Sequence, residues 1–317
     1  MLRRLGGLKD FGNLKEKLSK NLYEGSLSFR RKVLNSNLDK FIAKEKSGKE
    51  IEMEYLIGGK VGAPALILLH GFADDKYNFY KAGWRLGQHY QLIIPDIPGF
   101  GGSSCHQDIP YTVENITDWM SQFLMRLNIQ NAFIMGCSFG GVLAIKLARK
   151  HPELIKKIIL VGSAGFLPKN TRMKSIYDDF SKGRNIFYLK KSKDFDSLMN
   201  RIFFQKQYIP PLIKGYLAQD FINKKKWFVK MVDDLIPNMV HYNTAQEKKK
   251  LTYEKDLSKL NIPILTIWGE NDLIFPVDTV KILERYGEVI IFKDIGHCPQ
   301  MECPELFSKY VRRFLAV

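Results

Sequence analysis

Ser138 stands in a glycine-rich segment of the type that holds a nucleophile. It is the serine of Gly136-Cys137-Ser138-Phe139-Gly140, which follows the apolar run 132–135 and precedes a helix predicted from Val142. A serine on a sharp turn from strand to helix projects its hydroxyl out of the sheet. Side chains two residues before and after it would collide, so both positions need glycine. We therefore predict that Ser138 is a nucleophile, with the helix N-terminus directed at developing negative charge.

A serine nucleophile needs a general base, and His297 is the best placed of the six histidines. It lies just past the apolar run 289–292, on a segment that can reach a serine at the end of a neighbouring strand. His70 ends a predicted strand and is expected to bond the turn that follows it. His151 precedes Pro152 at the end of a predicted helix, and three others are expected to be solvated or to cap local structure: His89, His106 and His241.

The base in turn needs an acid that orients it and stabilises its protonated form. We choose Asp272, which follows the apolar run 264–267 and precedes His297 in the chain. Glu270 is the main rival, with Asp278 behind it, whereas Asp294 is expected to be a surface or turn residue. The order serine, acid, histidine is the one seen in hydrolases with this type of nucleophile turn.

Two backbone amides are expected to bind the oxyanion of an acyl-transfer reaction. One is the amide of Phe139, directly after the nucleophile. The other should come from the turn His70-Gly71-Phe72-Ala73, where we choose the amide of Phe72. Backbone position matters more here than residue type, because both donors are N–H groups.

Short apolar runs separated by helical patterns must position these residues. Runs that are apolar throughout indicate strands buried on both faces, and their alternation with helices predicts a mostly parallel sheet. A hairpin is expected to precede them, joining 41–43 to 51–57 around Lys46-Ser47-Gly48-Lys49. Thr112 is a candidate N-cap for a helix to Leu127. The predicted buried strands are 65–69, 92–94, 132–135, 158–161, 264–267 and 289–292.

The alternation stops between residues 167 and 258, which are rich in lysine and aromatic residues. We predict an α/β core formed by 37–166 and 259–317, with 167–258 inserted as a helical lid. Residues 1–36 form a separate amphipathic extension, with Leu14, Leu18 and Leu22 at four-residue spacing. The simplest interpretation is a helix packed on the domain. The alternative is a surface helix that lies on a membrane or covers a pocket.

Composition limits the partners and the location. The chain of 317 residues carries a net charge of +16, and 45% of its residues are hydrophobic, which excludes a largely disordered chain. The basic excess is mostly lysine, so we predict no nucleic-acid partner; peripheral contact with an anionic membrane surface is the alternative to a solvated surface. Four cysteines form no disulfide framework or zinc motif. We expect a cytoplasmic protein that needs no metal or organic cofactor.

These motifs together resemble the α/β-hydrolase superfamily over residues 50–316. The resemblance rests on His70-Gly71-Phe72, on the segment 96–103, on the Ser138 turn, and on the segments around Asp272 and His297. Within the superfamily the chain is similar to monoacylglycerol lipases and bacterial lipases. The segments 161–166, 225–228 and 301–305 carry this finer likeness, although Cys137 and Phe139 stand where that group often has threonine and methionine.

The resemblance implies a serine hydrolase that cleaves carboxylic esters through an acyl-enzyme. Monoacylglycerol-like lipids or short-to-medium acyl esters are the expected substrates, with lid aromatics forming the acyl pocket. One alternative is a carbon–carbon bond hydrolase acting on ring-cleavage dienones, which often shares the sequence Ser-Phe-Gly-Gly seen from Ser138. Another is a ligand-binding receptor with little turnover. Hydrolases with an aspartate nucleophile are disfavoured by Ser138.

Overall fold

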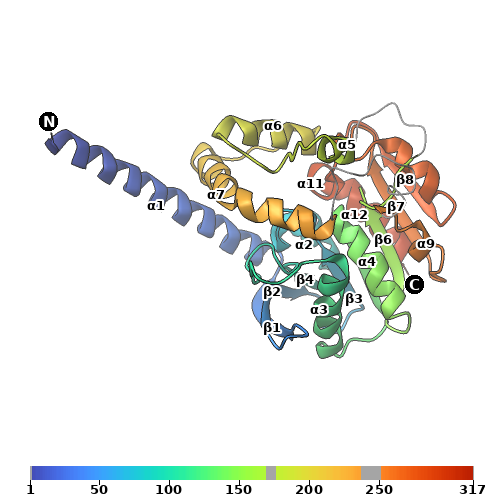
Figure 1. The fold of residues 1–317 in the computed structure, drawn as a ribbon. Helices are drawn as coiled ribbons and strands as arrows, with labels where there is room; N and C mark the ends of the chain where they lie inside the picture. Colours follow the sequence, from blue (N-terminus) through green and yellow to red (C-terminus); the bar gives the residue numbers. More distant parts are fainter. Residues whose placement is uncertain (1, 169–175, 237–250, 317) are drawn as a thin grey trace.

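An eight-stranded sheet forms the centre of the molecule in a computed structural model that describes residues 2–168, 176–236 and 251–316 (Figure 1). The strand order is β1-β2-β4-β3-β5-β6-β7-β8. The strands are β1 (Ser36–Lys44), β2 (Glu50–Gly59), β3 (Ala65–Leu69), β4 (Gln91–Pro95), β5 (Ala132–Cys137), β6 (Ile155–Val161), β7 (Ile264–Gly269) and β8 (Glu288–Phe292). All six predicted buried runs are strands, so this part of the prediction is confirmed.

The sheet is mostly parallel, as predicted. Only β1 and β2 run against their neighbours, as the expected hairpin and its pairing with β4. The pairs β3–β4, β3–β5, β5–β6, β6–β7 and β7–β8 are parallel. The carboxyl ends of β3, β5, β7 and β8 therefore lie at one edge, where loops carry ligand and catalytic groups in sheets of this kind.

Helices and short 3-10 turns cover both faces of the sheet. Among them, α3 begins as predicted, because the Thr112 hydroxyl accepts a hydrogen bond from the amide of Asn115 at 3.1 Å. The helical elements are α1 (Leu2–Val33), η1 (Lys76–Phe79), α2 (Tyr80–Leu86), α3 (Val113–Arg126), α4 (Phe139–Lys150), α5 (Ile176–Ser181), α6 (Ser192–Ile202), α7 (Pro211–Leu235), α9 (Glu254–Leu257), η4 (Val277–Thr279), α10 (Val280–Leu283), α11 (Pro299–Glu302) and α12 (Pro304–Leu315).

Alternate residues of the strands belong to two separate hydrophobic cores, one on each face of the sheet. Leu66 and Leu68 of β3 belong to the core shared with α2 and α12, whereas Ile67 and Leu69 belong to the core shared with α3 and α4. Successive side chains of a strand point to opposite faces, so a run that is apolar throughout is needed to fill both cores. Burial on both faces explains why runs without alternating polar residues predicted strands correctly.

The helix after Ser138 begins three residues earlier than predicted. It starts at Phe139 rather than Val142, so Gly140 and Gly141 lie inside its first turn. Glycine weakens a helix, which is why the sequence suggested a later start. Here tertiary packing decides, because a Cβ at Gly140 would lie 2.3 Å from the carbonyl oxygen of Leu69. Only glycine allows the helix to pack this close to β3.

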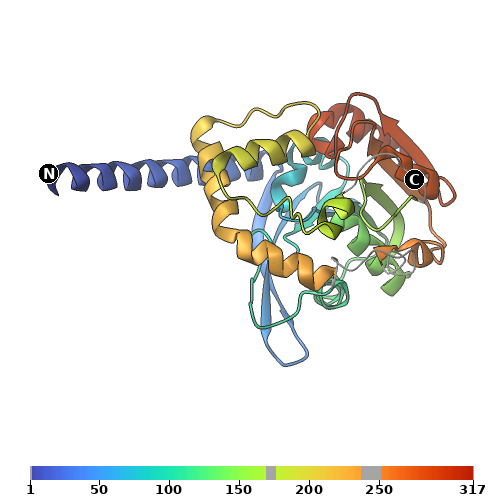
Figure 2. The ribbon, with the colours of Figure 1, turned by 45° about the horizontal axis from the view of Figure 1, so that its top comes forward.

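The N-terminal helix does not pack along its whole length, which corrects the simplest interpretation of its leucine stripe. Leu14, Leu18 and Leu22 are 64%, 49% and 44% exposed, and both ribbon views show α1 projecting from the rest of the molecule (Figures 1 and 2). A 32-residue helix is about 48 Å long, so only its last turns can reach the domain. There the rings of Tyr23 and Tyr216 lie 5.1 Å apart. No helix in the described ranges is long and apolar enough to span a membrane.

Helices α5, α6, α7 and α9 occupy the described part of the chain between β6 and β7, where the sequence predicted a helical lid. Figure 1 shows α6 and α7 together above the sheet. The indole of Trp227 on α7 donates to the carbonyl of Gly99 at 2.7 Å, and Asp234 accepts from the amide of Tyr111 at 2.8 Å. These bonds attach α7 to loops of the core. His241 and the lysine run 248–250 lie outside the described residues.

Candidate active site

Ser138 lies on the turn between β5 and α4, as the sequence predicted. Its backbone has φ 54° and ψ −119°, a region that residues with a Cβ rarely adopt. The chain crowds here, because a Cβ at Gly136 would lie 2.1 Å from the carbonyl oxygen of Gly140. The Ser138 amide donates to the carbonyl of Val161 at 2.9 Å, which ties the turn to β6. The strained turn is thus held by its neighbours on both sides.

Asp272 and His297 meet at the same edge of the sheet. The Nδ1 atom of His297 lies 2.7 Å from Oδ2 of Asp272, and the Asp272 side chain is fully buried. The other oxygen, Oδ1, accepts from the amides of Ile274 and Phe275 at 2.8 and 3.0 Å. Those two bonds fix the carboxylate in the loop after β7, so that its second oxygen faces the imidazole.

The electrostatics of this pair favour a protonated imidazole. Burial by itself lowers the pKa of His297, but the charge and hydrogen bond of Asp272 outweigh it and raise the pKa to about 8. A histidine in this setting accepts a proton readily when one is offered by a neighbouring hydroxyl.

His297 and Ser138 lie against the same short segment after β6. The amide of Ala164 donates to the carbonyl of Ser138 at 3.1 Å, and a Cβ at Gly162 would lie 3.0 Å from Nδ1 of His297. Both residues also line one cavity. The fold therefore brings together three residues that are far apart in the chain.

The rival acids lie elsewhere. Glu270 and Asp294 are exposed, and Asp278 binds Lys281 at 2.7 Å. Of these candidates only Asp272 forms a hydrogen bond to the imidazole of His297 among the described residues.

Two other described histidines, His70 and His151, are buried and bonded to groups outside the Ser138 turn. Nδ1 of His70 lies 2.7 Å from the carbonyl of Gly71, and its Nε2 accepts from the amide of Ile97 at 2.9 Å. Burial lowers the pKa of His70 to about 4, so it serves as a neutral bridge between two loops. This agrees with its expected role as a partner of the following turn. Nε2 of His151 lies 2.6 Å from the hydroxyl of Ser121.

The turn after β3 lies directly against the serine. A Cβ at Gly71 would be 3.2 Å from the Cβ of Ser138 and 3.7 Å from its Oγ. Phe72 follows in this turn, and Phe139 is the first residue of α4. The two amides predicted to bind an oxyanion therefore belong to segments that both border Ser138.

A family model for the alpha/beta hydrolase fold matches residues 64–304, which include all of these positions. The chain belongs to the α/β-hydrolase fold family.

Individual relatives of this α/β-hydrolase include lipases and other hydrolases. It is 29% identical over 274 residues to Lipase 1 of Psychrobacter immobilis, covering 84% of this chain and 81% of that protein. It is 28% identical over 278 residues to a 2-hydroxymuconate semialdehyde hydrolase of Pseudomonas putida, covering 80% and 88%. The crystal structure of a membrane phospholipase A, a bacterial virulence factor, is similar with a TM-score of 0.82 and 25% identity, covering 99% and 98%.

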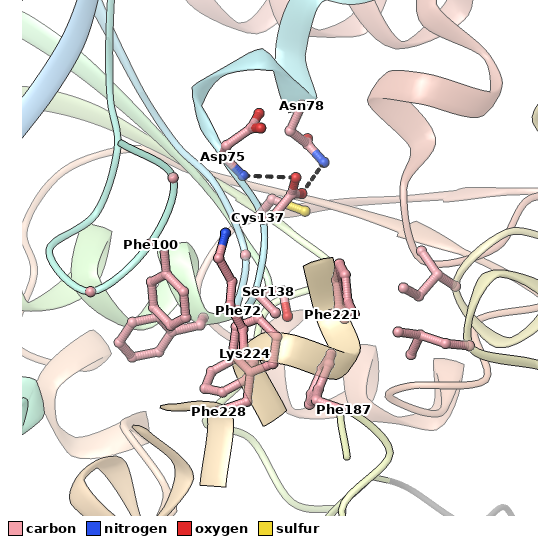
Figure 3. A pocket seen from close by; sticks show the side chains of 18 of the residues that line it. Phe72, Asp75, Asn78, Phe100, Cys137, Ser138, Phe187, Phe221, Lys224 and Phe228 are labelled. Atoms are coloured by element: carbon pink, nitrogen blue, oxygen red, sulfur yellow. Dashed lines mark hydrogen bonds between the residues drawn. The ribbon is translucent and has the colours of Figure 1, made fainter. Parts of the chain in front are cut away.

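A cavity of about 1010 Å³ opens at Ser138 in this α/β-hydrolase. On one side of the serine lies a group of aromatic rings, with the ring centroids of Phe72 and Phe187 4.7 Å apart and those of Phe221 and Phe228 5.2 Å apart (Figure 3). On the other side Figure 3 shows the polar residues Asp75 and Asn78. The cavity thus has an apolar part and a polar part, with the hydroxyl between them.

A buried ion pair holds the turn after β3, and sequence reasoning assigned it no role. The ammonium of Lys76 lies 2.5 Å from Oδ2 of Asp96 and 3.1 Å from Glu54. Asp96 also accepts from the amides of Lys76 and Gly102 at 2.6 and 2.7 Å. The signal available in the sequence was Asp96 itself, a carboxylate directly after an apolar strand.

Glu302 is a second residue without a predicted role. It lies on α11, just after His297, and its carboxylate accepts from backbone amides rather than from a cation.

No group of three or more histidine, cysteine or acidic residues suited to a metal ion occurs in the described part of the chain.

Proposed function

We propose that this chain is a serine carboxylic-ester hydrolase, an esterase or lipase that acts on monoacylglycerol-like lipids or short-to-medium acyl esters. The observation that carries the proposal is the buried Asp272–His297 pair, whose histidine lines the same cavity as Ser138. The similarity to Lipase 1 of Psychrobacter immobilis supports the ester class.

In the proposed reaction His297 takes the proton of Ser138 while the serine oxygen attacks the ester carbonyl. The amides of Phe72 and Phe139 bind the negative oxygen of the tetrahedral intermediate. His297 then gives the proton to the departing alcohol, which leaves an acyl group on Ser138. A water molecule, deprotonated by His297, attacks this acyl-enzyme and releases the carboxylic acid. Asp272 orients the imidazole and stabilises its charged form throughout.

The apolar part of the cavity is suited to the acyl chain. Phe187, Phe221 and Phe228 come from the predicted lid, 167–258. The rings of Phe187 and Phe228 contact Phe72 of the core, and Phe221 packs on Phe228. Each methylene group buried there contributes about 0.8 kcal/mol to binding. We propose that the helices of this segment act as a lid over the acyl site.

Hydrolysis of p-nitrophenyl esters of increasing chain length, and of a monoacylglycerol, tests the proposal. The wild type should turn over these esters, and Ser138→Ala should reduce kcat by roughly 10⁶-fold, the loss typical of removing a serine nucleophile. A folded wild type that hydrolyses none of them would sink the proposal, and a receptor with little turnover would then be the better interpretation.

A carbon–carbon bond hydrolase is the second candidate, because the chain is 28% identical to a 2-hydroxymuconate semialdehyde hydrolase. The same serine and histidine would serve, but the substrate would be a ring-cleavage dienone. Turnover of a dienone in the absence of ester turnover would favour this candidate.

We also propose a cytoplasmic protein that contacts an anionic membrane surface through α1. The net charge of +16 and the exposed leucines of α1 support this contact. The similar structure of a membrane phospholipase A covers 99% of this chain, α1 included.

A further inference from the structure

Arg30 and Lys81 line the cavity as two cations without a carboxylate partner. Neither forms an ion pair with any acidic side chain in the described residues. Of the other lysines on this cavity, Lys76 is paired with Asp96 at 2.5 Å and Lys224 with Asp220 at 2.8 Å. Lys226 also has no ion pair within the described ranges, but it is exposed to solvent, whereas Arg30 and Lys81 are half-buried. Half-buried cations are normally paired, so two unpaired ones on a cavity wall point to an anion that binds there.

The two cations act on each other. Burial, followed by the positive charge of Arg30, lowers the pKa of Lys81. Arg30 is held in place, since its guanidinium lies 4.8 Å from the ring centre of Tyr80, the residue before Lys81. A bound anion would relieve the repulsion between these like charges, which neutral acceptors cannot do fully.

The position of Lys81 relates this pair to the reaction. Its ammonium donates to the side-chain oxygen of Gln207 at 2.6 Å and to the carbonyl of Met301 at 3.3 Å. Met301 lies on α11, which follows His297 directly. In the proposed mechanism His297 protonates the departing alcohol, so the alcohol part of the substrate must lie on this side.

We propose that Arg30 and Lys81 bind a phosphate carried by the alcohol part of the substrate, so that the preferred substrate is an acylglycerol with a phosphate headgroup. This rests on the proposed ester hydrolysis and adds the headgroup class to it. The aromatic rings that Figure 3 shows beside Ser138 take the acyl chain, and the two cations of the cavity wall take the phosphate.

The acidic groups near this site do not cancel the two cations. Asp74, Asp75 and Asp220 also border the cavity. The carboxylate of Asp74 accepts from the amide of Asp75 at 2.8 Å and from the side chain of Asn78. One carboxylate oxygen of Asp75 accepts from the amide of Tyr77 at 2.8 Å, and Asp220 is paired with Lys224. Since Arg30 belongs to α1, the N-terminal helix supplies half of the proposed site. A phosphate can accept charge-assisted hydrogen bonds from both side chains at once.

The test compares two substrates that differ only in the phosphate, 1-octanoylglycerol and 1-octanoylglycerol 3-phosphate, each below its aggregation limit. The wild type should prefer the phosphate-bearing ester. In Arg30→Gln and Lys81→Gln the ratio of kcat/KM for the phosphate ester to that for the neutral ester should fall about tenfold each, the cost of one charge-assisted hydrogen bond. Lys81→Arg should restore part of the ratio. Lys60→Gln removes an exposed charge distant from the cavity and should leave the ratio unchanged.

Several results would overturn the inference. Equal losses on both esters would mean that the two residues only support the fold. A ratio that falls as much in Lys60→Gln would mean general attraction by net charge. Inorganic phosphate could inhibit hydrolysis of the neutral ester while Arg30→Gln and Lys81→Gln leave the kcat/KM ratio of the two esters unchanged. The site would then bind free phosphate and not a lipid headgroup. In each case activity that depends on Ser138 would still stand, whereas a wild type inactive on both esters would remove the proposed function itself.

Discussion

The carboxylate of Glu302 accepts a hydrogen bond from the amide of Gly296 at 3.0 Å, one residue before His297. The same carboxylate accepts from the amides of Phe204 and Gln205 at 2.9 and 2.8 Å. A single acidic side chain on α11 therefore ties the histidine loop to the segment between α6 and α7. The position of the proposed base depends on this clamp.

Glu302→Gln should lower kcat by about tenfold, because an amide side chain replaces one acceptor oxygen with a donor and loses the charge that strengthens these bonds. KM should change less than kcat, since the cavity wall remains. Glu305→Gln is the control, as the Glu305 side chain is 81% exposed and forms an ion pair with Arg85. Steady-state kinetics with one ester measures both variants; equal effects at the two positions would contradict the clamp.

The pH dependence of kcat/KM should report the pKa of His297. The base must be neutral in the free enzyme, and its pKa is raised to about 8. The rate should therefore rise about tenfold per pH unit below pH 8 and level off above it. Asp272→Asn should move the rising part of the pH profile to lower pH, because burial still lowers the pKa of His297 while the carboxylate charge that raised it is lost. The same substitution should reduce kcat roughly 10⁴-fold. An inflection below pH 6.5 in the wild type would show that this charge balance is wrong.

Phe221→Trp should shorten the preferred acyl chain. The ring centroid of Phe221 lies 5.6 Å from that of Phe195 and 5.2 Å from that of Phe228, within the apolar part of the cavity. A larger ring there should exclude about two methylene groups, so the kcat/KM ratio of decanoate to butyrate ester should fall about tenfold. Phe204→Trp, at a 47% exposed position, serves as the control. An unchanged chain-length profile would place the acyl chain elsewhere.

Asp96→Asn should destabilise the fold by about 3 kcal/mol, because it leaves the buried ammonium of Lys76 with only Glu54 as a partner. Urea unfolding monitored by fluorescence measures the change. Glu52→Gln breaks an exposed ion pair with Lys40 and should cost at most about 1 kcal/mol. Similar losses in both variants would mean that burial of Lys76 carries no special cost.

Replacing Leu14, Leu18 and Leu22 by serine should weaken binding to anionic vesicles without lowering thermal stability, because all three side chains are exposed. Co-sedimentation with vesicles of anionic and zwitterionic lipid measures the binding. Val61→Ser, at an 88% exposed position in the turn between β2 and β3, is the matched control. Unchanged sedimentation of the triple variant would remove the membrane role proposed for α1.

Local patterns in the sequence were enough for the strands and the Ser138 turn. A strand buried on both faces must be apolar throughout, and a crowded turn must have glycine at Gly136 and Gly140, so both features are written into neighbouring residues. The Thr112 cap is local for the same reason. These predictions needed no knowledge of which segments meet in space.

Only the tertiary structure decided which distant groups face one another. Glu270 and Asp272 are two residues apart in one loop, and only the path of that loop turns Asp272 toward His297. The leucine stripe of α1 predicted a helix packed on the domain, but the helix extends beyond the domain and the leucines are exposed. The approach of Arg30 to Lys81 has no local signal either, because it depends on where α1 crosses α2. Contacts between segments far apart in the chain are set by the whole fold.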